Sequence, residues 1–450
     1  MAGPPCAVQG LILMGREFAY QVVYRYLVAL IDEAERGGQP RLPSLRALSR
    51  RLQVSLATVQ AAYSLLEHEG RVQSVPKSGY FAQVGLQAGR ADVAHALPAQ
   101  PLLERALFAH ERRLGRLRTR PAQGLGGQRL RDALAERYTR SSRQYWRPED
   151  VHLGPDVQAL LETLLLALAL RGCTVVVASP CCWRILRALQ RCDMRIIELP
   201  LDSAGSPDID SLSRLLGREP VRMMIMPSCL GFPVGRLMPQ RAQQQIGDLL
   251  ALHPVWLLEN DLDSELCYYP PAESRLRDWV DPRWLLILGS LEATMGAEAP
   301  YAYLLGGHSA LADAFNQRAF QIAPMRQQAL AQMITSGEMD EHLRRMRVAL
   351  QVRMAQLCQH LSARLGGQLD FDMPEGGCAL WVRLSPESVG AQAVAATAGS
   401  VLQVLAGEQF SVHGRYRQFL ALTWLGEEPG ALIEALEGLA RGLAFDAIRR

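Results

Sequence analysis

Lysine is almost absent from this chain of 450 residues: of its 48 lysine and arginine residues, only Lys77 is a lysine. A coding bias toward arginine explains why arginine replaces lysine on the surface. It does not explain the loss of a catalytic lysine. Arginine keeps its proton at neutral pH and cannot act as an amine nucleophile. Residues 78–450 therefore contain no lysine amine that could form a Schiff base.

Long apolar segments are also missing. The longest apolar run, Ala159 to Leu170, has 12 residues and includes Glu162 and Thr163, whereas a bilayer span needs about 20. The amino terminus lacks the basic region and the small-residue cleavage site of a signal peptide. We therefore expect a cytoplasmic protein with no membrane segment.

The cysteines follow no pairing pattern. They are nine in number, and none is placed at C-x-x-C spacing, which disfavours a disulfide framework or a zinc site. We expect no metal and mostly reduced, buried thiols. The neighbours Cys181 and Cys182 could bond to each other only in a strained geometry. With 49% hydrophobic and 21% charged residues, the composition is that of a globular protein of two or three domains.

The amino-terminal segment predicts three helices. Apolar residues recur at helical spacing from Phe18 to Gly37. Ser44 is placed to cap a second helix, Leu45–Leu52, and Ser55 to cap a third, Leu56–His68. The short turn between the last two indicates a helix-turn-helix.

A two-stranded wing and a local basic patch follow. The strands are expected over Arg71–Val75 and Tyr80–Val84. The net charge of the whole chain is only +3, so nucleic-acid binding would need a local patch. Residues 41–77 supply one, because six basic residues outnumber two acidic ones by four: Arg41, Arg46, Arg50, Arg51, Arg71 and Lys77 against Glu67 and Glu69.

The stretch LPSLRALSRRLQVSLATVQAAYSLLEHEGRVQSVPKSGYFAQV resembles the winged helix of GntR-type transcription regulators. The sequence departs from the commonest pattern at Leu56, where many relatives have arginine, so base readout would rely on Gln60 or the wing. A winged helix can instead serve protein interaction, but the arginines of the second helix favour DNA. The resemblance implies a domain over residues 15–85 whose third helix enters the major groove and whose DNA contacts are Arg46, Arg50, Ser55, Thr58, Gln60, Lys77, Ser78, Gly79 and Tyr80.

Residues 86–125 are predicted to form a linker, because they contain several glycines and prolines and show little regular spacing of apolar residues. The exception is one expected helical segment, Leu102 to Leu117. Residues 111–120 hold five arginines and one acid. These arginines are expected to contact phosphates, to form a solvated helix face, or to clamp the segment onto acidic residues of the following domain.

The remaining residues predict an α/β domain with a largely parallel sheet, since short apolar stretches alternate with helical ones. A long helical region, residues 311–365, then leads to a smaller mixed domain. The expected strands are Thr174–Ala178, Arg195–Leu199, Arg222–Met226, Val255–Leu258 and Leu285–Leu288.

Seven motifs in order resemble fold-type-I aminotransferases: residues 126–138, ASPCCW, PSCLGFPVGRLMP, LENDLDSEL, LGSLEAT, EGGCALWVRL and FSVHGRYRQFLAL. Together with the winged helix, they resemble MocR-type regulators. The resemblance implies an aminotransferase-like domain over residues 126–450, with a large part at about 126–310 and a small α+β part at about 335–450. It also implies a homodimer, with pyridoxal 5'-phosphate as the family's cofactor.

The residues that this cofactor requires are replaced. By the resemblance, the Schiff-base lysine falls at Ala293, the aspartate that protonates the pyridine nitrogen at Asn260, and the asparagine that bonds the ring hydroxyl at Phe232. An amide cannot supply the aspartate's charge. By the same resemblance, the family's tyrosine falls at Leu262, its phosphate-binding arginine at Pro300, its substrate-binding arginine at Ala421 and its phosphate-cup glycine at Asp156.

We therefore expect no cofactor and no enzymatic activity. The expected function is a homodimeric regulator that binds a double-stranded DNA operator, with the aminotransferase-like domain serving dimerisation and sensing of an unknown effector. Two rivals stay open: a regulator or aminotransferase that uses pyridoxal phosphate non-covalently, and a scaffold that docks a partner protein. Because Cys, Leu, Phe and Ala stand at formerly polar positions of the cofactor pocket, we expect either an apolar effector there or a filled interior without a ligand.

Overall fold

The structure is a computed structural model. It divides into two compact units, residues 1–94 (unit 1) and residues 95–450 (unit 2). It describes residues 23, 24, 26, 27, 30, 31, 42–68, 72–75, 79–82, 101–116, 125–269, 274–296, 298–385, 390–426 and 428–447.

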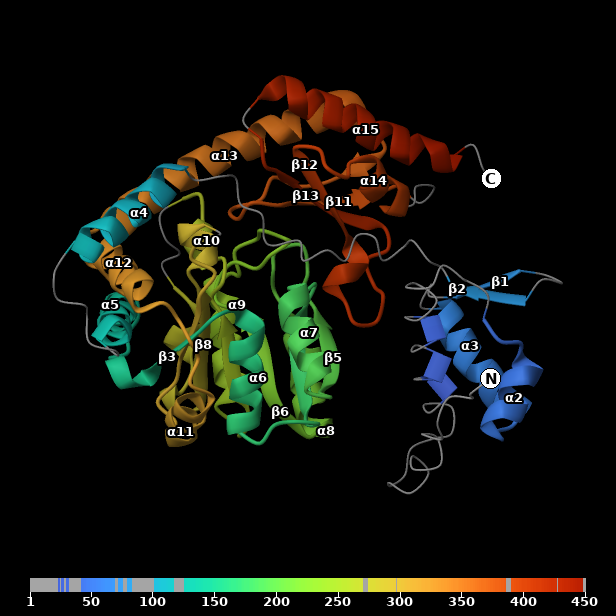
Figure 1. The fold of residues 1–450 in the computed structure, drawn as a ribbon, viewed down its shortest axis with the longest axis horizontal. Coiled ribbons are helices and arrows are strands. Elements are labelled where there is room, and N and C mark those ends of the chain that lie inside the picture. Colours follow the sequence, from blue (N-terminus) through green and yellow to red (C-terminus); the bar gives the residue numbers. More distant parts are fainter. Residues whose placement is uncertain are drawn as a thin grey trace. The chain divides into compact units, whose positions relative to one another are not determined.

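Unit 1 contains the predicted helix-turn-helix and two-stranded sheet (Figure 1). Helix α2 (Leu45–Leu52) begins where Ser44 Oγ accepts a hydrogen bond from Ala47 N–H, and it ends at Gln53 in a left-handed conformation. Helix α3 (Leu56–His68) follows, and antiparallel strands β1 (Val72–Val75) and β2 (Gly79–Ala82) complete the unit. The predicted bounds of both helices are confirmed.

The core of unit 1 lies between these elements and the helical residues before them. Val23, Leu27 and Ile31 are buried with Val59 and Tyr63 of α3. The apolar residues that recur at helical spacing in the first helix are therefore buried where the structure describes them.

Unit 2 is built on a seven-stranded sheet with the order β3-β9-β8-β7-β6-β4-β5. The strands from β8 to β5 are parallel to one another, and β9 runs antiparallel to both of its neighbours. The prediction of a largely parallel sheet is confirmed. The strands are β3 (Val151–Gly154), β4 (Thr174–Ser179), β5 (Arg195–Pro200), β6 (Val221–Pro227), β7 (Trp256–Asn260), β8 (Leu285–Ser290) and β9 (Ala302–Leu305).

Helices cover the sheet and join it to a smaller one. Helix α6 packs against both α7 and α11, α8 packs on α9, and α4 and α5 both pack on α12 (Figure 1). The bounds are α4 (Pro101–Arg116), α5 (Leu125–Arg140), α6 (Val157–Ala167), α7 (Trp183–Arg191), α8 (Ile209–Arg218), α9 (Gln240–Leu250), α10 (Glu292–Met295), α11 (Ser309–Arg318) and α12 (Pro324–Thr335). The 3-10 turns are η1 (Pro148–Asp150), η2 (Ser264–Leu266), η3 (Leu276–Trp279), η4 (Pro282–Trp284) and η5 (Gly407–Phe410).

The smaller sheet is antiparallel, with the order β10-β11-β13-β12. Residues 311–365, expected as one helical region, form α11, α12 and the long α13 (Glu338–Leu365). Pro324 lies in the first turn of α12, and Gly337 has a φ of +82° before α13, so the chain turns at both places. The remaining elements are β10 (Leu369–Asp370), β11 (Leu380–Leu384), α14 (Gly390–Ala396), β12 (Leu402–Ala406), β13 (Phe419–Trp424) and α15 (Pro429–Ala447).

Candidate functional site

The first candidate surface is formed by α2 and α3 of unit 1. Arg46 and Arg50 are exposed on α2, and Gln60 is exposed on α3. Ser55 Oγ accepts a hydrogen bond from Thr58 N–H at 3.0 Å and lies 2.7 Å from Thr58 Oγ1. The two hydroxyl groups therefore stabilise the first turn of α3.

The wing is anchored to the core of unit 1 by an aromatic pair. The rings of Tyr80 and Tyr63 lie 4.2 Å apart between centroids, and Tyr80 C=O accepts a hydrogen bond from Leu42 N–H. Gly79 has a φ of +110°, which favours glycine. Lys77 and Ser78 lie outside the described residues. Leu56, the departure from the common pattern, is 45% exposed at the start of α3.

The second candidate site is the crevice at the carboxyl ends of β4, β6, β7 and β8. Parallel strands bring their carboxyl ends to one edge of a sheet, where α/β proteins bind ligands. Here the loops after Ser179, Pro227, Asn260 and Ser290 meet at that edge.

A buried ion pair spans this crevice. Arg184 on α7 donates to Glu292 on α10 through both guanidinium ends, at 2.5 Å from Nη1 to Oε2 and 3.2 Å from Nη2 to Oε1. Their side chains are 17% and 11% exposed. Burial alone would lower the pKa of Arg184. The hydrogen bond and the negative charge of Glu292 together outweigh this effect, so the pKa is raised. The fork geometry of arginine matches carboxylate and phosphate alike, and here it holds the protein's own carboxylate.

Asp156 occupies the amino end of α6. Its Oδ1 accepts a hydrogen bond from Ala159 N–H at 2.8 Å, and its charge also acts on Arg184. A helix amino terminus attracts anions because its first N–H groups lack helical partners. A carboxylate of the chain therefore takes a place that is suited to a phosphate.

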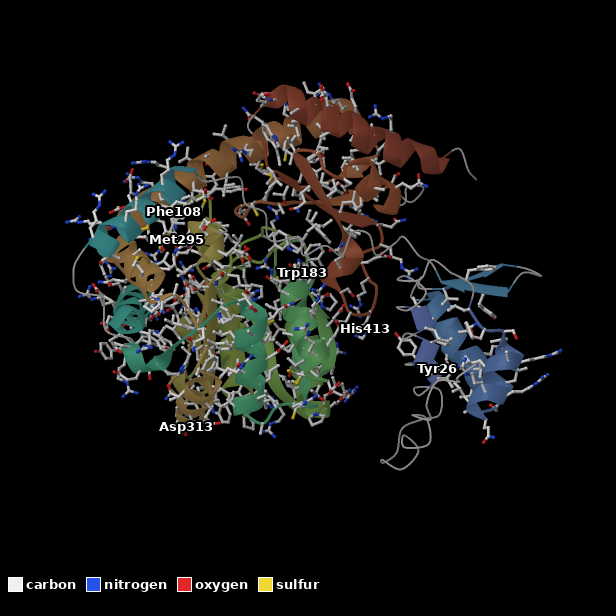
Figure 2. All side chains as sticks on the ribbon, viewed as in Figure 1. Tyr26, Phe108, Trp183, Met295, Asp313 and His413 are labelled. Atoms are coloured by element: carbon white, nitrogen blue, oxygen red, sulfur yellow. The ribbon has the colours of Figure 1, made fainter. Side chains whose placement is uncertain are left out.

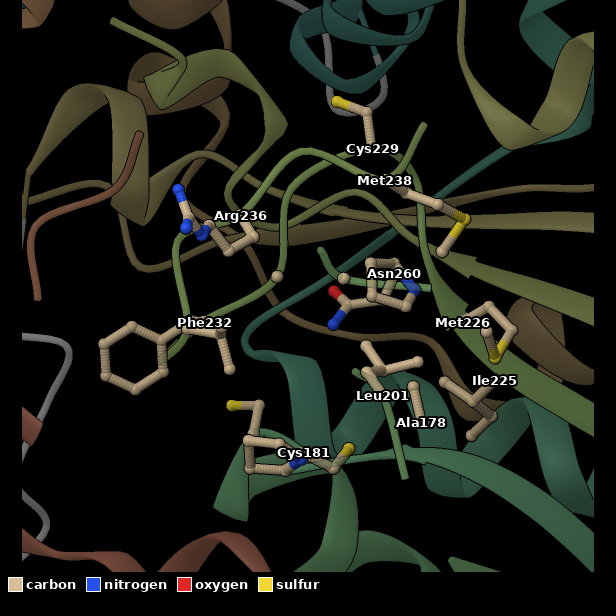
Figure 3. A pocket seen from close by; sticks show the side chains of 16 residues that line it. Ala178, Cys181, Leu201, Ile225, Met226, Cys229, Phe232, Arg236, Met238 and Asn260 are labelled. Atoms are coloured by element: carbon tan, nitrogen blue, oxygen red, sulfur yellow. The ribbon is translucent and has the colours of Figure 1, made fainter. Parts of the chain in front are cut away.

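Two of the predicted cofactor positions line one small cavity. Asn260 and Phe232 face it together with Cys181, Cys182 and Cys229 (Figure 3). The cavity has a volume of about 20 Å³, which is enough for about one water molecule. The side-chain oxygen of Asn260 accepts a hydrogen bond from Leu262 N–H at 3.3 Å. This oxygen is therefore already engaged with the backbone of the same loop.

The other predicted positions are not brought to this cavity. Ala293 is buried in α10 beside Glu292, and Leu262 belongs to the hydrophobic core. Ala421 is buried in β13, where it pairs with strands β11 and β12 on either side. Pro300 is exposed.

A buried charge cluster that the sequence did not reveal lies beneath the crevice. Asp261 is 3.0 Å from Arg277 and 3.5 Å from Arg275, and it accepts a hydrogen bond from Tyr138 Oη at 2.6 Å. Arg277 Nε also lies 3.2 Å from Glu259. Burial alone would raise the pKa of Asp261, but the two arginines lower it to about 2. These partners are distant in sequence, so only the fold brings them together.

Asp263 is buried differently. Its side chain faces a narrow space near Phe232, Gly376 and Gly377, and it is 4% exposed. Burial and then the charge of Asp261 raise its pKa to about 7. Asp263 is therefore close to half protonated at neutral pH.

The thiols are free at the eight cysteines that the structure describes. Burial raises the pKa of Cys181 well above its ordinary value and that of Cys182 to about 11, so both remain protonated at neutral pH. Within the described ranges, no three side chains form a metal-binding group. The helices of the described part are all too short or too polar to cross a membrane.

Comparison with known families identifies both parts of the chain. The model for aminotransferase class I and II matches residues 84–423, and the model for bacterial regulatory proteins of the gntR family matches residues 19–81. The uncharacterized HTH-type transcriptional regulator YjiR of Escherichia coli K12 is 27% identical, covering 89% of this chain and 94% of its own length. The probable rhizopine catabolism regulatory protein MocR of Rhizobium meliloti is 25% identical over 58% of this chain and 52% of its own length.

Among solved structures, the α-aminoadipate aminotransferase LysN of Thermus thermophilus superposes with a TM-score of 0.69 at 19% identity. The match covers 81% of this chain and 98% of that enzyme, which was crystallised with N-(5'-phosphopyridoxyl)-L-leucine. The likeness shows that unit 2 has the fold-type-I aminotransferase fold.

Proposed function

This chain belongs to the aminotransferase class I and II family and carries a gntR-family helix-turn-helix domain, and from this premise we propose that it is a transcription regulator that does not use the family cofactor. Unit 1 would bind operator DNA, and unit 2 would serve dimerisation. A protein with this target would act in the cytoplasm, where the DNA is.

The exposed side chains of unit 1 support DNA binding. Arg46 and Arg50 on α2 have no acidic partner among the described residues, so both remain available for phosphates. Exposed Gln60 and Leu56 on α3 would reach base edges, glutamine toward adenine and leucine toward a thymine methyl group. We also assign the wing residues 77–80 to DNA, as the resemblance implies.

The residues of unit 2 do not fit pyridoxal phosphate. The observation that carries this conclusion is that residues 78–450 contain no lysine, so no register of the alignment supplies the Schiff-base amine. At the expected position of that amine stands Ala293, buried in α10. Asn260 offers no negative charge to a protonated pyridine nitrogen.

The residues at the expected position of the cofactor phosphate also disfavour pyridoxal phosphate binding. Arg184 is held by Glu292 through both ends of its guanidinium group, and Asp156 caps α6. A bound phosphate dianion would meet two carboxylates and would have to break a buried ion pair, at a cost on the order of several kcal/mol. The small cavity near Asn260 favours a filled interior over a pocket for a large effector.

Dimerisation belongs to the same proposal. Homo-oligomers with two-fold symmetry are the commonest kind, and a two-fold dimer of helix-turn-helix domains binds two half-sites. We therefore propose a homodimer on an operator with two half-sites.

The DNA-binding part is tested with the full-length protein and fragmented genomic DNA. Fragments retained by the protein are sequenced, and the affinity for the enriched site is measured as a function of salt. We expect a steep fall of log Kobs with log salt, because phosphate contacts release counterions. Retention without site enrichment or without a salt slope would refute DNA regulation.

The cofactor part has its own test. The protein is incubated with pyridoxal phosphate, reduced with borohydride, and digested for mass spectrometry. We expect no phosphopyridoxyl group on any peptide beyond Lys77. A stoichiometric adduct there would overturn the proposal, whereas weak labelling of Lys77 itself would reflect the ordinary reactivity of a lysine amine.

A further inference from the structure

Helix α4 of unit 2 carries four exposed arginines on its outer side: Arg105, Arg112, Arg113 and Arg116. We name them the α4 arginine stripe. In the described parts of the chain, none of the four has an acidic partner. The opposite side of α4 is apolar and buried through Leu103, Leu107 and Leu114, and it packs on α12.

The acidic residues of α4 are directed inward. Glu111 pairs with Arg326 of α12, at 3.2 Å from Oε2 to Nη2. Glu104 lies beside Gly296, where its Oε1 is within 3.8 Å of a Cβ position built on that glycine. His110 also pairs inward, at 3.1 Å from Glu338. Glu111 and His110 therefore hold α4 to α12 and α13 of the same unit. The four arginines take no part in this contact and are available to another partner.

The geometry of the stripe suits a phosphate backbone. At 3.6 residues per turn, Arg105, Arg112 and Arg116 fall within about 20° of one line along the helix, and the line is about 16 Å long. Figure 2 shows nitrogen atoms along the outer edge of this helix, which the Phe108 label marks. Guanidinium groups donate two parallel hydrogen bonds to a phosphate, so three of them along one line suit the phosphate backbone of a duplex.

Other exposed arginines of unit 2 are commonly neutralised nearby. Arg171 pairs with Asp193, Arg195 with Glu219, and Arg283 with Asp281. A solvated surface of this chain thus often places a carboxylate next to an arginine. The α4 arginine stripe lacks such carboxylates over its whole length, which is the pattern expected of a surface for an anionic partner.

We propose that the α4 arginine stripe binds backbone phosphates of the duplex that flanks the operator half-site. The inference rests on the proposed DNA-binding function of unit 1, and it assigns a DNA contact to unit 2 as well. Residues 83–100 connect β2 to α4, and a chain of that length spans at most about 60 Å. Arg105, four residues into α4, therefore lies within about 66 Å of Ala82 at the end of the wing, which is about 19 base pairs at 3.4 Å per base pair.

The test uses the full-length protein and two duplexes that contain the enriched site, one trimmed to the footprint of unit 1 and one with about 20 base pairs added at each end. The stripe variant is Arg105→Gln/Arg112→Gln/Arg116→Gln. The matched control is Arg222→Gln/Arg241→Gln/Arg383→Gln, which removes three exposed arginines that also lack acidic partners among the described residues.

For the parent protein and the control, we expect a steeper salt dependence on the long duplex than on the short one. Each phosphate contact contributes about 0.9 to the slope of log Kobs against log salt, so the stripe variant should lose about 2 to 3 on the long duplex only. On the short duplex, all three proteins should bind alike.

Two results would overturn the inference. One is an unchanged long-duplex slope in the stripe variant. The other is a changed oligomeric state of the stripe variant in sedimentation, without a loss of slope, which would make the stripe an interface between two copies of this chain. Failure of the parent protein to bind the short duplex would instead refute the proposed function of unit 1, so the two failures are distinguishable.

Discussion

Charged side chains are used in opposite ways in two regions of this chain. On α2 of unit 1, Arg46 and Arg50 are exposed and have no acidic partner among the described residues. In the crevice of unit 2, Arg184 is half-buried and Arg277 is buried, and both hold carboxylates of the same chain. Free charges serve a partner molecule, whereas internally paired charges fix the shape of a domain. In unit 2, the crevice of the aminotransferase-like fold therefore has its charges satisfied by the chain itself.

The largest expected effect comes from breaking the pairing beneath the crevice. Asp261→Asn removes the carboxylate next to Arg275 and Arg277, so that buried Arg275 loses its acidic partner and Arg277 keeps only Glu259. We expect a loss of about 3 to 5 kcal/mol in the free energy of unfolding, measured by urea denaturation. The control Asp372→Asn breaks a pair in which the carboxylate is 73% exposed, and it should cost less than about 1 kcal/mol. Equal losses in both variants would show that the buried pairs of Asp261 contribute no more to stability than an exposed pair does.

A pH-dependent effect is expected at Asp263. Its pKa is raised from 3.8 to about 7 in the folded protein, so the folded state binds the proton more tightly than the unfolded chain does. Stability should therefore fall as pH rises from about 4 to 7. Asp263→Asn removes this penalty, and we expect it to stabilise the protein by roughly 2 to 4 kcal/mol at pH 8 and by little at pH 4. A pH-independent effect in urea denaturation would contradict the assignment.

Restoring the missing amine should not by itself restore the cofactor site. In Ala293→Lys, the new ammonium group would lie beside Glu292 and pair with it, while Arg184 and Asp156 remain engaged. We expect borohydride labelling by pyridoxal phosphate to match that of Leu252→Lys, a lysine placed at a position that is 77% exposed. Mass spectrometry compares the two. Stoichiometric labelling of Ala293→Lys alone would show that the loss of lysine is the whole defect.

The smallest expected effect is at the DNA surface. Arg46→Ala should weaken binding to the enriched site by about tenfold and reduce the salt slope by about 0.9, because it removes one phosphate contact. Arg222→Ala, an exposed arginine on β6, is the control and should leave both quantities unchanged. Electrophoretic mobility shifts at several salt concentrations measure them.

Local patterns predicted the elements well, because local physics determines them. Ser44 and Ser55 cap the two helices where the sequence placed them, and the five apolar stretches became β4 to β8. The three-helix division of residues 311–365 was missed, although Pro324 and Gly337 mark its breaks. Strand β9 was missed as well, because its four residues form a strand only by pairing with β8 and β3.

The site was less predictable because its contacts are non-local. Arg184 and Glu292 are separated by 108 residues, so no spacing rule connects them. The same is true of Asp261 and Tyr138, which are 123 residues apart. The sequence predicts which cofactor-binding groups are replaced, but only the fold shows which carboxylates hold the cations of the crevice.

The most direct test of the central claim is equilibrium dialysis of the full-length protein against pyridoxal 5'-phosphate, with LysN of Thermus thermophilus, first freed of cofactor, as a positive control. We predict no saturable binding to this chain under conditions in which the control is saturated. Saturable binding of one cofactor per chain, persisting in Lys77→Arg, would contradict the account.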